Sequence, residues 1–232
     1  MSTSNTSHLM QLSAIVEAYR SKANTIPVYN SDLLPLIREY KALWAKHADQ
    51  HTINACFRSI LEGLLNTLLV VPFNYDQANE FPNDRTLHFS GRAAVRFNLD
   101  SIVYRAEHMT PEEQSELAWV VENGLPTADL AWWDIRRIAG SEGYTFADPS
   151  VKRGSMYPRT AGNANGSFML VYTGIDQLMA SPLGKNFTGH VGIYALDEVV
   201  TLAMSVPEVK GFIINPDTDT HCFVDKAVFT RG

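Results

Sequence analysis

The sequence has few cysteines, no long hydrophobic run and no leader-like start. Its two cysteines, Cys56 and Cys222, among 232 residues exclude a disulfide framework and predict free thiols. The most apolar stretch, residues 63–75, is shorter than the ~20 residues that a membrane-spanning helix needs, and Pro72 interrupts it. The first ten residues lack a basic segment followed by an apolar one, so we expect no signal peptide. These absences predict a cytoplasmic protein that does not bind membranes.

Basic residues are also scarce, because 19 Lys and Arg face 25 Asp and Glu and the formal net charge is −6. Broad nucleic-acid binding needs a basic surface, so we expect no nucleic-acid partner, and anionic membrane surfaces are disfavoured for the same reason. The composition, 45% hydrophobic and 19% charged, is typical of a globular chain with an ordinary core. At ~150 residues per domain, the length fits one large domain or two small ones.

Motifs that carry catalysis or cofactor binding are missing as well. Neither GxGxxG, GxxxxGK[ST] nor GxSxG occurs in the chain. His47 and His51 have the spacing of two zinc ligands on one helix, but the glutamate of a zinc protease is absent beside His47. The acidic segment 217–221 lacks the glycine and distal glutamate of a calcium loop and is more typical of a tight turn. We therefore predict no metal, no cofactor and no catalytic residue.

Apolar residues at helical spacing predict three helices in the N-terminal part of the chain, over residues 9–19, 33–44 and 53–64. A buried strand follows from residue 68 and is predicted to end at Pro72. Residues 86–89 and 93–99 are predicted to form a hairpin around Ser90-Gly91. Thr110-Pro111 has the signals of a helix start, and a further helix is predicted over 127–139. Residues 141–167 are predicted to be a mobile loop or a boundary between lobes.

The C-terminal third alternates short β-rich and helical segments. We predict strands over 168–172, 190–194, 211–214 and 222–224, with helices over 174–180 and 197–205. The order is β-α-β-α-β-β, which favours some parallel pairing with helices packed on the sheet. The sequence thus predicts an α+β fold, in which N-terminal helices and a central helical insert pack on a mixed β-sheet.

Several of these segments carry a family resemblance. A strand ends in Tyr172-Thr173, and a later one reads Gly-apolar-apolar-apolar-Asn-Pro from Gly211 to Pro216. With a helix-then-strand segment over 57–74, this pattern resembles the SseB-type domain of bacterial proteins, over residues 57–74 and 167–224. The resemblance implies a single α+β domain over residues 1–232 with a central insert at about 75–166. It also implies an accessory or regulatory role without catalysis.

One segment has the composition of a binding surface. Trp132 and Trp133 are adjacent, and each lies one helical turn before an arginine, Arg136 and Arg137 respectively. Neighbouring helical residues point about 100° apart, and the spacing permits each guanidinium to stack on an indole. Trp and Arg are enriched at interface hot spots. The alternative is a broad apolar helix face that buries both rings and leaves the arginines solvated.

Three functional hypotheses follow. The first, which we favour, is a cytoplasmic protein-binding or accessory module of SseB type that binds through the four Trp and Arg residues. The second is an immunity-type protein that neutralises a toxin, since its acidity suits a basic toxin surface. The third is a hydrolase whose site in the central insert gathers His88, Asp100, Glu107 and His108.

Overall fold

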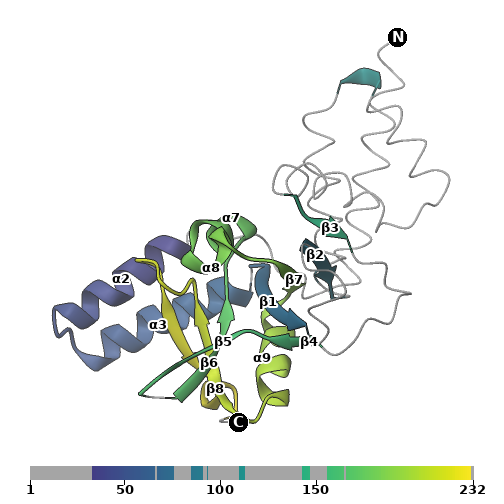
Figure 1. Cartoon of the computed structure of the whole chain (residues 1–232). Coiled ribbons are helices and arrows are strands. Elements are labelled where there is room, and N and C mark those ends of the chain that lie inside the picture. Colours follow the sequence, from purple (N-terminus) through teal and green to yellow (C-terminus); the bar gives the residue numbers. More distant parts are fainter. Residues whose placement is uncertain are drawn as a thin grey trace. The chain divides into compact units, whose positions relative to one another are not determined.

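The computed structural model describes residues 33–65, 67–75, 85–90, 93, 110–112, 143–146, 156–164 and 166–230. The chain divides into two compact units, one formed by 1–26 and 91–144 and the other by 27–90 and 145–232. Nearly all described residues belong to the second unit, whose helices and strands are labelled in Figure 1. Within the described ranges, no helix has the length and apolar character needed to cross a membrane.

The first described elements form a helical hairpin, α2 (Leu33–Ala45) and α3 (Gln50–Leu65), as the sequence predicts. Pro35 lies in the first turn of α2, where a backbone N–H has no helical partner to lose. The Asp49 carboxylate accepts hydrogen bonds from Thr52 N, at 2.9 Å, and from Thr52 Oγ1, at 2.6 Å, and so caps α3. His47 lies in the turn with a φ of 52°, whereas His51 lies in α3. The two histidines therefore do not share a helix face.

Within the described residues, sheet A has five strands in the order β3-β2-β7-β1-β4. The strands are β1 (Leu69–Tyr75), β2 (Arg85–Phe89), β3 (Thr145–Phe146), β4 (Met156–Pro158) and β7 (Gly189–Tyr194). The central strand β7 pairs antiparallel with β1 and parallel with β2, so the sheet is mixed. Both sides of β2 are occupied, by β3 and β7, and Ala93 is helical. The predicted second hairpin strand is therefore wrong at Ala93, and its other residues, 94–99, lie outside the described residues.

Sheet B, as far as the chain is described, has four strands in the order β5-β6-β8-β9, and β6 and β8 are its one parallel pair. The strands are β5 (Thr160–Asn163), β6 (Gly166–Val171), β8 (Val209–Ile214) and β9 (Cys222–Asp225). Helices α7 (Ile175–Ala180), α8 (Pro182–Lys185) and α9 (Leu196–Ser205) lie between these strands in sequence, and a 3-10 helix, η1 (Lys226–Phe229), follows β9. The predicted α+β class and C-terminal β-α-β-α-β-β order are confirmed, with α8 as an addition and two mixed sheets in place of one.

The two sheets join at a corner built around Arg159. This residue separates β4 from β5; its N–H donates to the Pro72 carbonyl and its carbonyl accepts from the Leu170 N–H, both at 2.8 Å. Pro72 lies inside β1, so the prediction that it ends the strand is wrong. In a strand, the N–H and C=O of one residue point to the same side. The N–H that Pro72 lacks would therefore face the corner, where the hydrogen bonding between β1 and β4 is interrupted. The predicted irregular stretch 141–167 likewise contains β3, β4 and β5.

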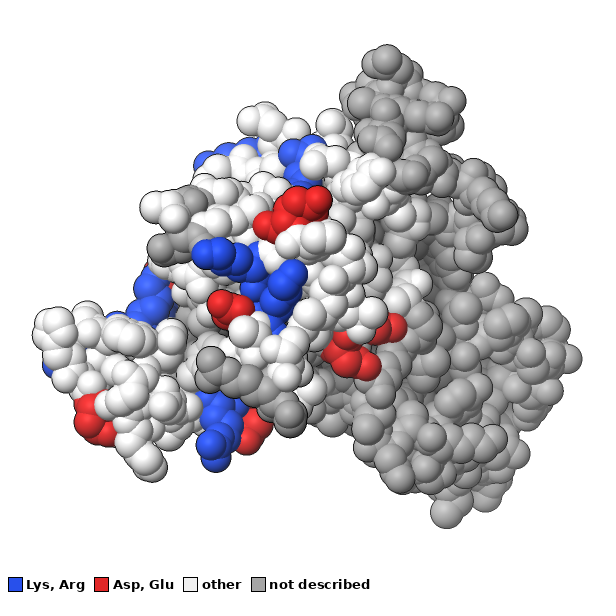
Figure 2. All heavy atoms as spheres, turned by 90° about the horizontal axis from the view of Figure 1, so that it is seen from below, with Lys and Arg blue, Asp and Glu red and all other residues white. Residues whose placement is uncertain are grey.

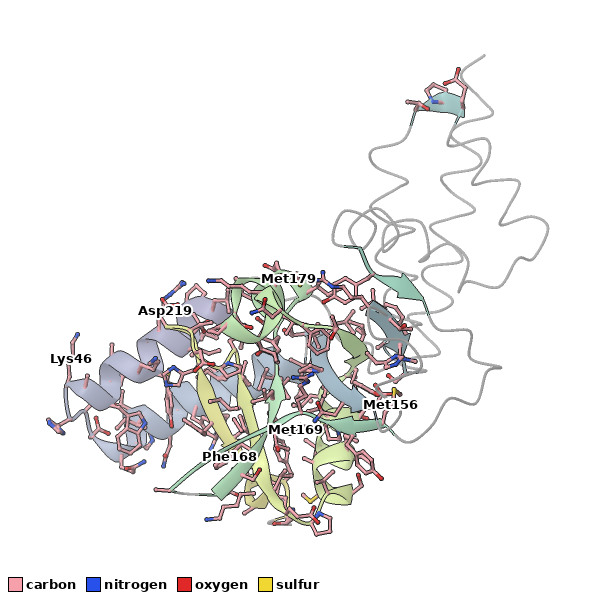
Figure 3. The ribbon with its side chains drawn as sticks, viewed as in Figure 1. Lys46, Met156, Phe168, Met169, Met179 and Asp219 are labelled. Carbon is pink, nitrogen blue, oxygen red and sulfur yellow. The ribbon has the colours of Figure 1, made fainter. Side chains whose placement is uncertain are left out.

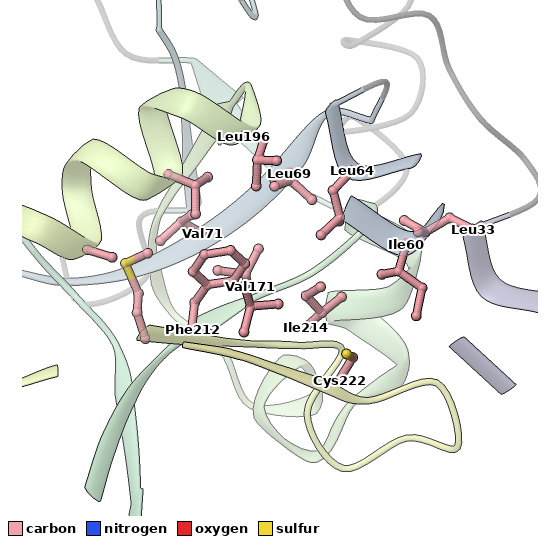
Figure 4. Packing of buried hydrophobic residues seen from close by; sticks show 14 of the residues in the cluster. Leu33, Ile60, Leu64, Leu69, Val71, Val171, Leu196, Phe212, Ile214 and Cys222 are labelled. Carbon is pink, nitrogen blue, oxygen red and sulfur yellow. The ribbon is translucent and has the colours of Figure 1, made fainter. Parts of the chain in front are cut away.

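The core lies between the inner faces of the two sheets and is closed by α2, α3 and α9. Figure 4 shows Phe212 and Val171 of sheet B facing Val71 of sheet A. Ile60 and Leu64 of α3 join the same cluster. The remaining predicted helices, over 9–19 and 127–139, lie outside the described residues, although Pro111 and Glu112 are helical as expected.

Buried thiol and phenol groups make the stability of this core sensitive to alkali. Burial raises the pKa of the Cys222 thiol from 9.0 to about 12, raises that of Tyr194 from 10.0 to about 12, and also raises that of Cys56. In the unfolded chain these groups lose their protons at their ordinary values, so between pH 9 and pH 12 the unfolded state binds fewer protons than the folded one. The contribution of these groups to the free energy of unfolding is complete below pH 9 and is lost as the pH rises towards 12.

We therefore expect the free energy of unfolding, measured by urea titration, to fall steadily across that range. The Cys222→Ala variant removes one of the titrating groups and should show a shallower decline. A native chain whose stability is unchanged from pH 9 to pH 12 would contradict this account.

Candidate functional site

The residues predicted to bind a partner, Trp132, Trp133, Arg136 and Arg137, lie outside the described residues. Asp100, Glu107 and His108 of the hydrolase hypothesis lie outside them too, whereas His88 is described. The described residues contain a different aromatic group that the sequence placed on a helix but did not assign to a site.

The apolar stripe of α2 continues past the core. Leu33 and Ile37 are buried, with 2% and 0% of their surface exposed, but Trp44, two turns beyond Ile37, is 50% exposed. Tyr40 lies between them and is partly buried. Figure 1 shows that the end of the hairpin, where α2 and α3 join, lies away from the two sheets. Within the described part of the chain, the stripe thus passes from buried at Leu33 and Ile37 to half exposed at Trp44.

Three rings form a continuous surface on the hairpin. The Tyr40 ring lies 6.4 Å from the Trp44 ring in an edge-to-face arrangement and 5.6 Å from the Phe57 ring of α3. Such contacts stabilise a fixed ring geometry, so Trp44 is held by its neighbour. We call Tyr40, Trp44 and Phe57 the aromatic surface.

The helices beneath the aromatic surface are firmly packed. Ile53, Cys56 and Ile60 of α3 are buried, and the Cys56 thiol donates to the Leu36 carbonyl at 3.6 Å. Cys56 is thus the core thiol that the sequence predicts, and both cysteines are free. Partial burial also raises the pKa of the Tyr40 hydroxyl, which therefore stays neutral. The surface is consequently an uncharged aromatic face on a supported helix pair.

Charged side chains of both signs border this surface. Lys41, Lys46 and His47 lie near it in the sequence, and the carboxylates of Glu39 and Asp49 flank them. Lys41 is engaged, because its Nζ lies 3.0 Å from both the Asp219 carbonyl and His221 Nδ1. Figure 3 shows Lys46 at the end of the hairpin. On the face of the molecule seen in Figure 2, basic and acidic side chains are likewise interspersed over the described residues.

A second polar group lies where the parallel strands β6 and β8 end. Asn215 is fully buried and its Oδ1 accepts a hydrogen bond from the Thr173 N–H at 2.9 Å. Its Nδ2 lies 3.0 Å from Thr173 Oγ1 and 3.4 Å from Thr220 Oγ1. Carboxyl ends of parallel strands are common ligand sites, but here the polar atoms bond to one another. The segment between β8 and β9 is thus the turn that the sequence predicts.

A third group is a histidine pair on sheet A. His88 Nε2 of β2 lies 3.0 Å from His190 Nδ1 of β7, and His190 is buried. Ser90 donates to the Glu198 carboxylate, which also accepts from the Ala195 N–H at 2.8 Å and so caps α9. Among the described residues, no three His, Cys, Asp or Glu side chains are placed to hold one metal ion.

The signal for Trp44 was present in the sequence. Its stripe from Leu33 ends in a tryptophan that is followed directly by Ala45, Lys46 and His47. Helical spacing alone could not distinguish a stripe that is buried throughout from one that extends past the core. Comparisons of the chain with protein-family models, with curated proteins and with solved structures find no match.

Proposed function

We propose that the chain is a protein-binding module without catalytic activity and that it binds its partner through the aromatic surface. The observation that carries the proposal is the exposure of Trp44, half of whose surface is open at the end of an otherwise buried stripe. Tryptophan is among the residue types most enriched at interface hot spots. Its ring is already ordered against Tyr40, so binding costs little side-chain entropy.

The border of the aromatic surface carries charges of both signs, because Lys46 lies between Glu39 and Asp49 in the sequence. The proposed partner is therefore defined by an apolar pocket that receives Trp44. The net charge of −6 of the whole chain is the argument for a basic partner such as a toxin.

The test is a binding measurement with the full chain. The native chain is immobilised, partners are captured from lysate, and the stoichiometric one is purified for titration calorimetry against Trp44→Ser. We expect Trp44→Ser to weaken binding about 30-fold, since a hot-spot residue contributes at least ~2 kcal/mol. The matched control is Tyr157→Ser, because Tyr157 is an equally exposed aromatic residue on β4.

Equal binding by Trp44→Ser and the native chain would reject the aromatic surface as the site. A loss confined to the Trp132→Ala/Arg136→Ala double variant would instead place the site on the predicted helix over 127–139. Absence of any stoichiometric partner for the native chain would reject the function itself.

A further inference from the structure

The last strand of sheet B presents one side chain of an unexpected kind. Cys222 and Val224 of β9 point into the core and are buried, so His221, Phe223 and Asp225 lie on the outer face. Phe223 is 44% exposed. Its ring lies 5.1 Å from that of Phe168, which Figure 3 labels on β6, and 6.1 Å from that of His221. We call residues 221–225 the β9 edge.

An edge strand exposes backbone N–H and C=O groups that can pair with another strand. Natural proteins usually protect such edges with lysine, proline or a bulge. Among the described strands β9 is terminal in sheet B, and it carries a phenylalanine at the middle of its outer face. Lys41 lies against His221 at the start of the β9 edge, and the strand is only four residues long, so its ends are protected, whereas its middle carries the exposed Phe223.

The side chains of the β9 edge are complementary to themselves. When two copies of an edge strand pair antiparallel, the two-fold axis is normal to the sheet, so outer-face residues of one copy lie opposite outer-face residues of the other. With the axis at Phe223, the two Phe223 rings face each other. His221 of each copy then lies opposite Asp225 of the other, at a Cβ separation of about 5 Å.

The two neighbouring registers lack this complementarity. With the axis at Val224, each Phe223 lies opposite an Asp225 carboxylate. With the axis at Cys222, each Phe223 lies opposite His221, and each Asp225 has no residue of β9 opposite it. Aromatic pairs, and polar pairs that share a hydrogen bond, stabilise cross-strand contacts. The side chains therefore select the register centred on Phe223.

We propose that two copies of this chain associate through their β9 edges, antiparallel and centred on Phe223, and so form a continuous eight-stranded sheet from two copies of sheet B. His221 and Asp225 each have an atom available for a hydrogen bond across the pair. Among the described residues His221 uses only Nδ1, which contacts Lys41 and the Thr218 carbonyl. Asp225 uses Oδ1 to accept from the Ala227 N–H at 2.8 Å, which leaves Oδ2. The aromatic surface is not part of this interface.

The test is sedimentation velocity of the full chain over a range of protein concentrations. We expect a reversible monomer–dimer equilibrium in the native chain. Phe223→Lys places two lysines at the axis and should weaken the dimer at least about tenfold. Asp225→Asn keeps an acceptor for the cap on η1 but removes the carboxylate that faces His221 in each copy, and should weaken the dimer by about fivefold. Tyr157→Lys is the control for adding a lysine at another exposed aromatic position.

Covalent trapping tests the register directly. Under a mild oxidant we expect Phe223→Cys to form a disulfide-linked dimer, because the two positions face each other, and we expect Tyr157→Cys to stay monomeric. Circular dichroism confirms that each variant is folded. A native chain that is monomeric at every concentration overturns the proposal, and so does a dimer that Phe223→Lys leaves unchanged.

Discussion

Replacing Asn215 with alanine is expected to lower the free energy of unfolding by about 3 kcal/mol, measured by urea denaturation. The side chain is fully buried, and its loss leaves the Thr173 N–H without its acceptor in the interior. Asn215 also has a φ of 43°, in the left-handed region that alanine adopts only at a cost of about 1 kcal/mol. The expected loss combines these two effects.

Two further variants separate the loss of the Asn215 hydrogen bonds from the backbone strain at this position. Asn215→Gly removes the hydrogen bonds but adopts the positive φ without strain, so it should be less destabilising than Asn215→Ala by about 1 kcal/mol. Asn215→Asp keeps the acceptor for the Thr173 N–H, yet it buries a carboxylate and loses the donor to Thr220 Oγ1. If Asn215→Ala were as stable as the native chain, the hydrogen bonds between the ends of β6 and β8 would not contribute to the fold.

Gly211→Ala is expected to be comparably destabilising, by about 3 kcal/mol. A Cβ on Gly211 would lie 2.0 Å from the Val224 carbonyl oxygen and 2.9 Å from the Asp225 Cα. Both atoms belong to the backbone of β9, so no side-chain rotation relieves the clash, and the β8–β9 pairing must open locally. Thermal and urea denaturation measure the effect.

Gly162→Ala is the matched control for this substitution. Gly162 also lies in sheet B, but the nearest atom to its added Cβ is the Gly166 carbonyl oxygen, at 4.0 Å. We expect a change of less than about 0.5 kcal/mol there. Equal destabilisation by the two variants would show that the loss does not come from the contact of the added Cβ with β9, because the smaller backbone entropy of the unfolded alanine chain favours folding at both positions.

These two positions show what the sequence could and could not predict. The apolar run between Gly211 and Asn215 predicted β8, and the turn residues after it predicted the hairpin to β9. The sequence did not reveal why position 211 requires glycine and position 215 asparagine. The requirement comes from contacts with Val224 and Thr173, which only folding brings close to Gly211 and Asn215. The SseB-type resemblance rests on such positions, and it stays a prediction.

Errors at the sheets have the same origin. Pro72 was expected to end a strand because proline removes a donor, and the sequence does not reveal that its missing N–H faces the corner at Arg159. The hairpin after β2 was expected from local pattern, whereas β2 is enclosed by β3 and β7, which come much later in the chain. Local periodicity predicts elements well but not which strand occupies each side.

The candidate site was predictable only in part. Helical spacing placed Tyr40 and Trp44 on one face of a helix, but whether that face is buried depends on how far the neighbouring elements extend. The β9 edge depends similarly on the strand order of sheet B. Residue type drew attention to Trp132 and Trp133, and that hypothesis awaits the binding experiment.

The corner between the sheets has a consequence for how the chain is made. The pairing partners of β1 in sheet A, β7 and β4, and its bridge to Tyr172 all follow residue 155. During synthesis, α2, α3 and β1 therefore leave the ribosome long before any strand exists to complete their sheet. At ~5–20 residues per second, the apolar face of β1 stays unpaired for several seconds or more. Such unpaired strands are prone to aggregation, and among the described elements the packing of α2 against α3 is the contact that can form in that interval.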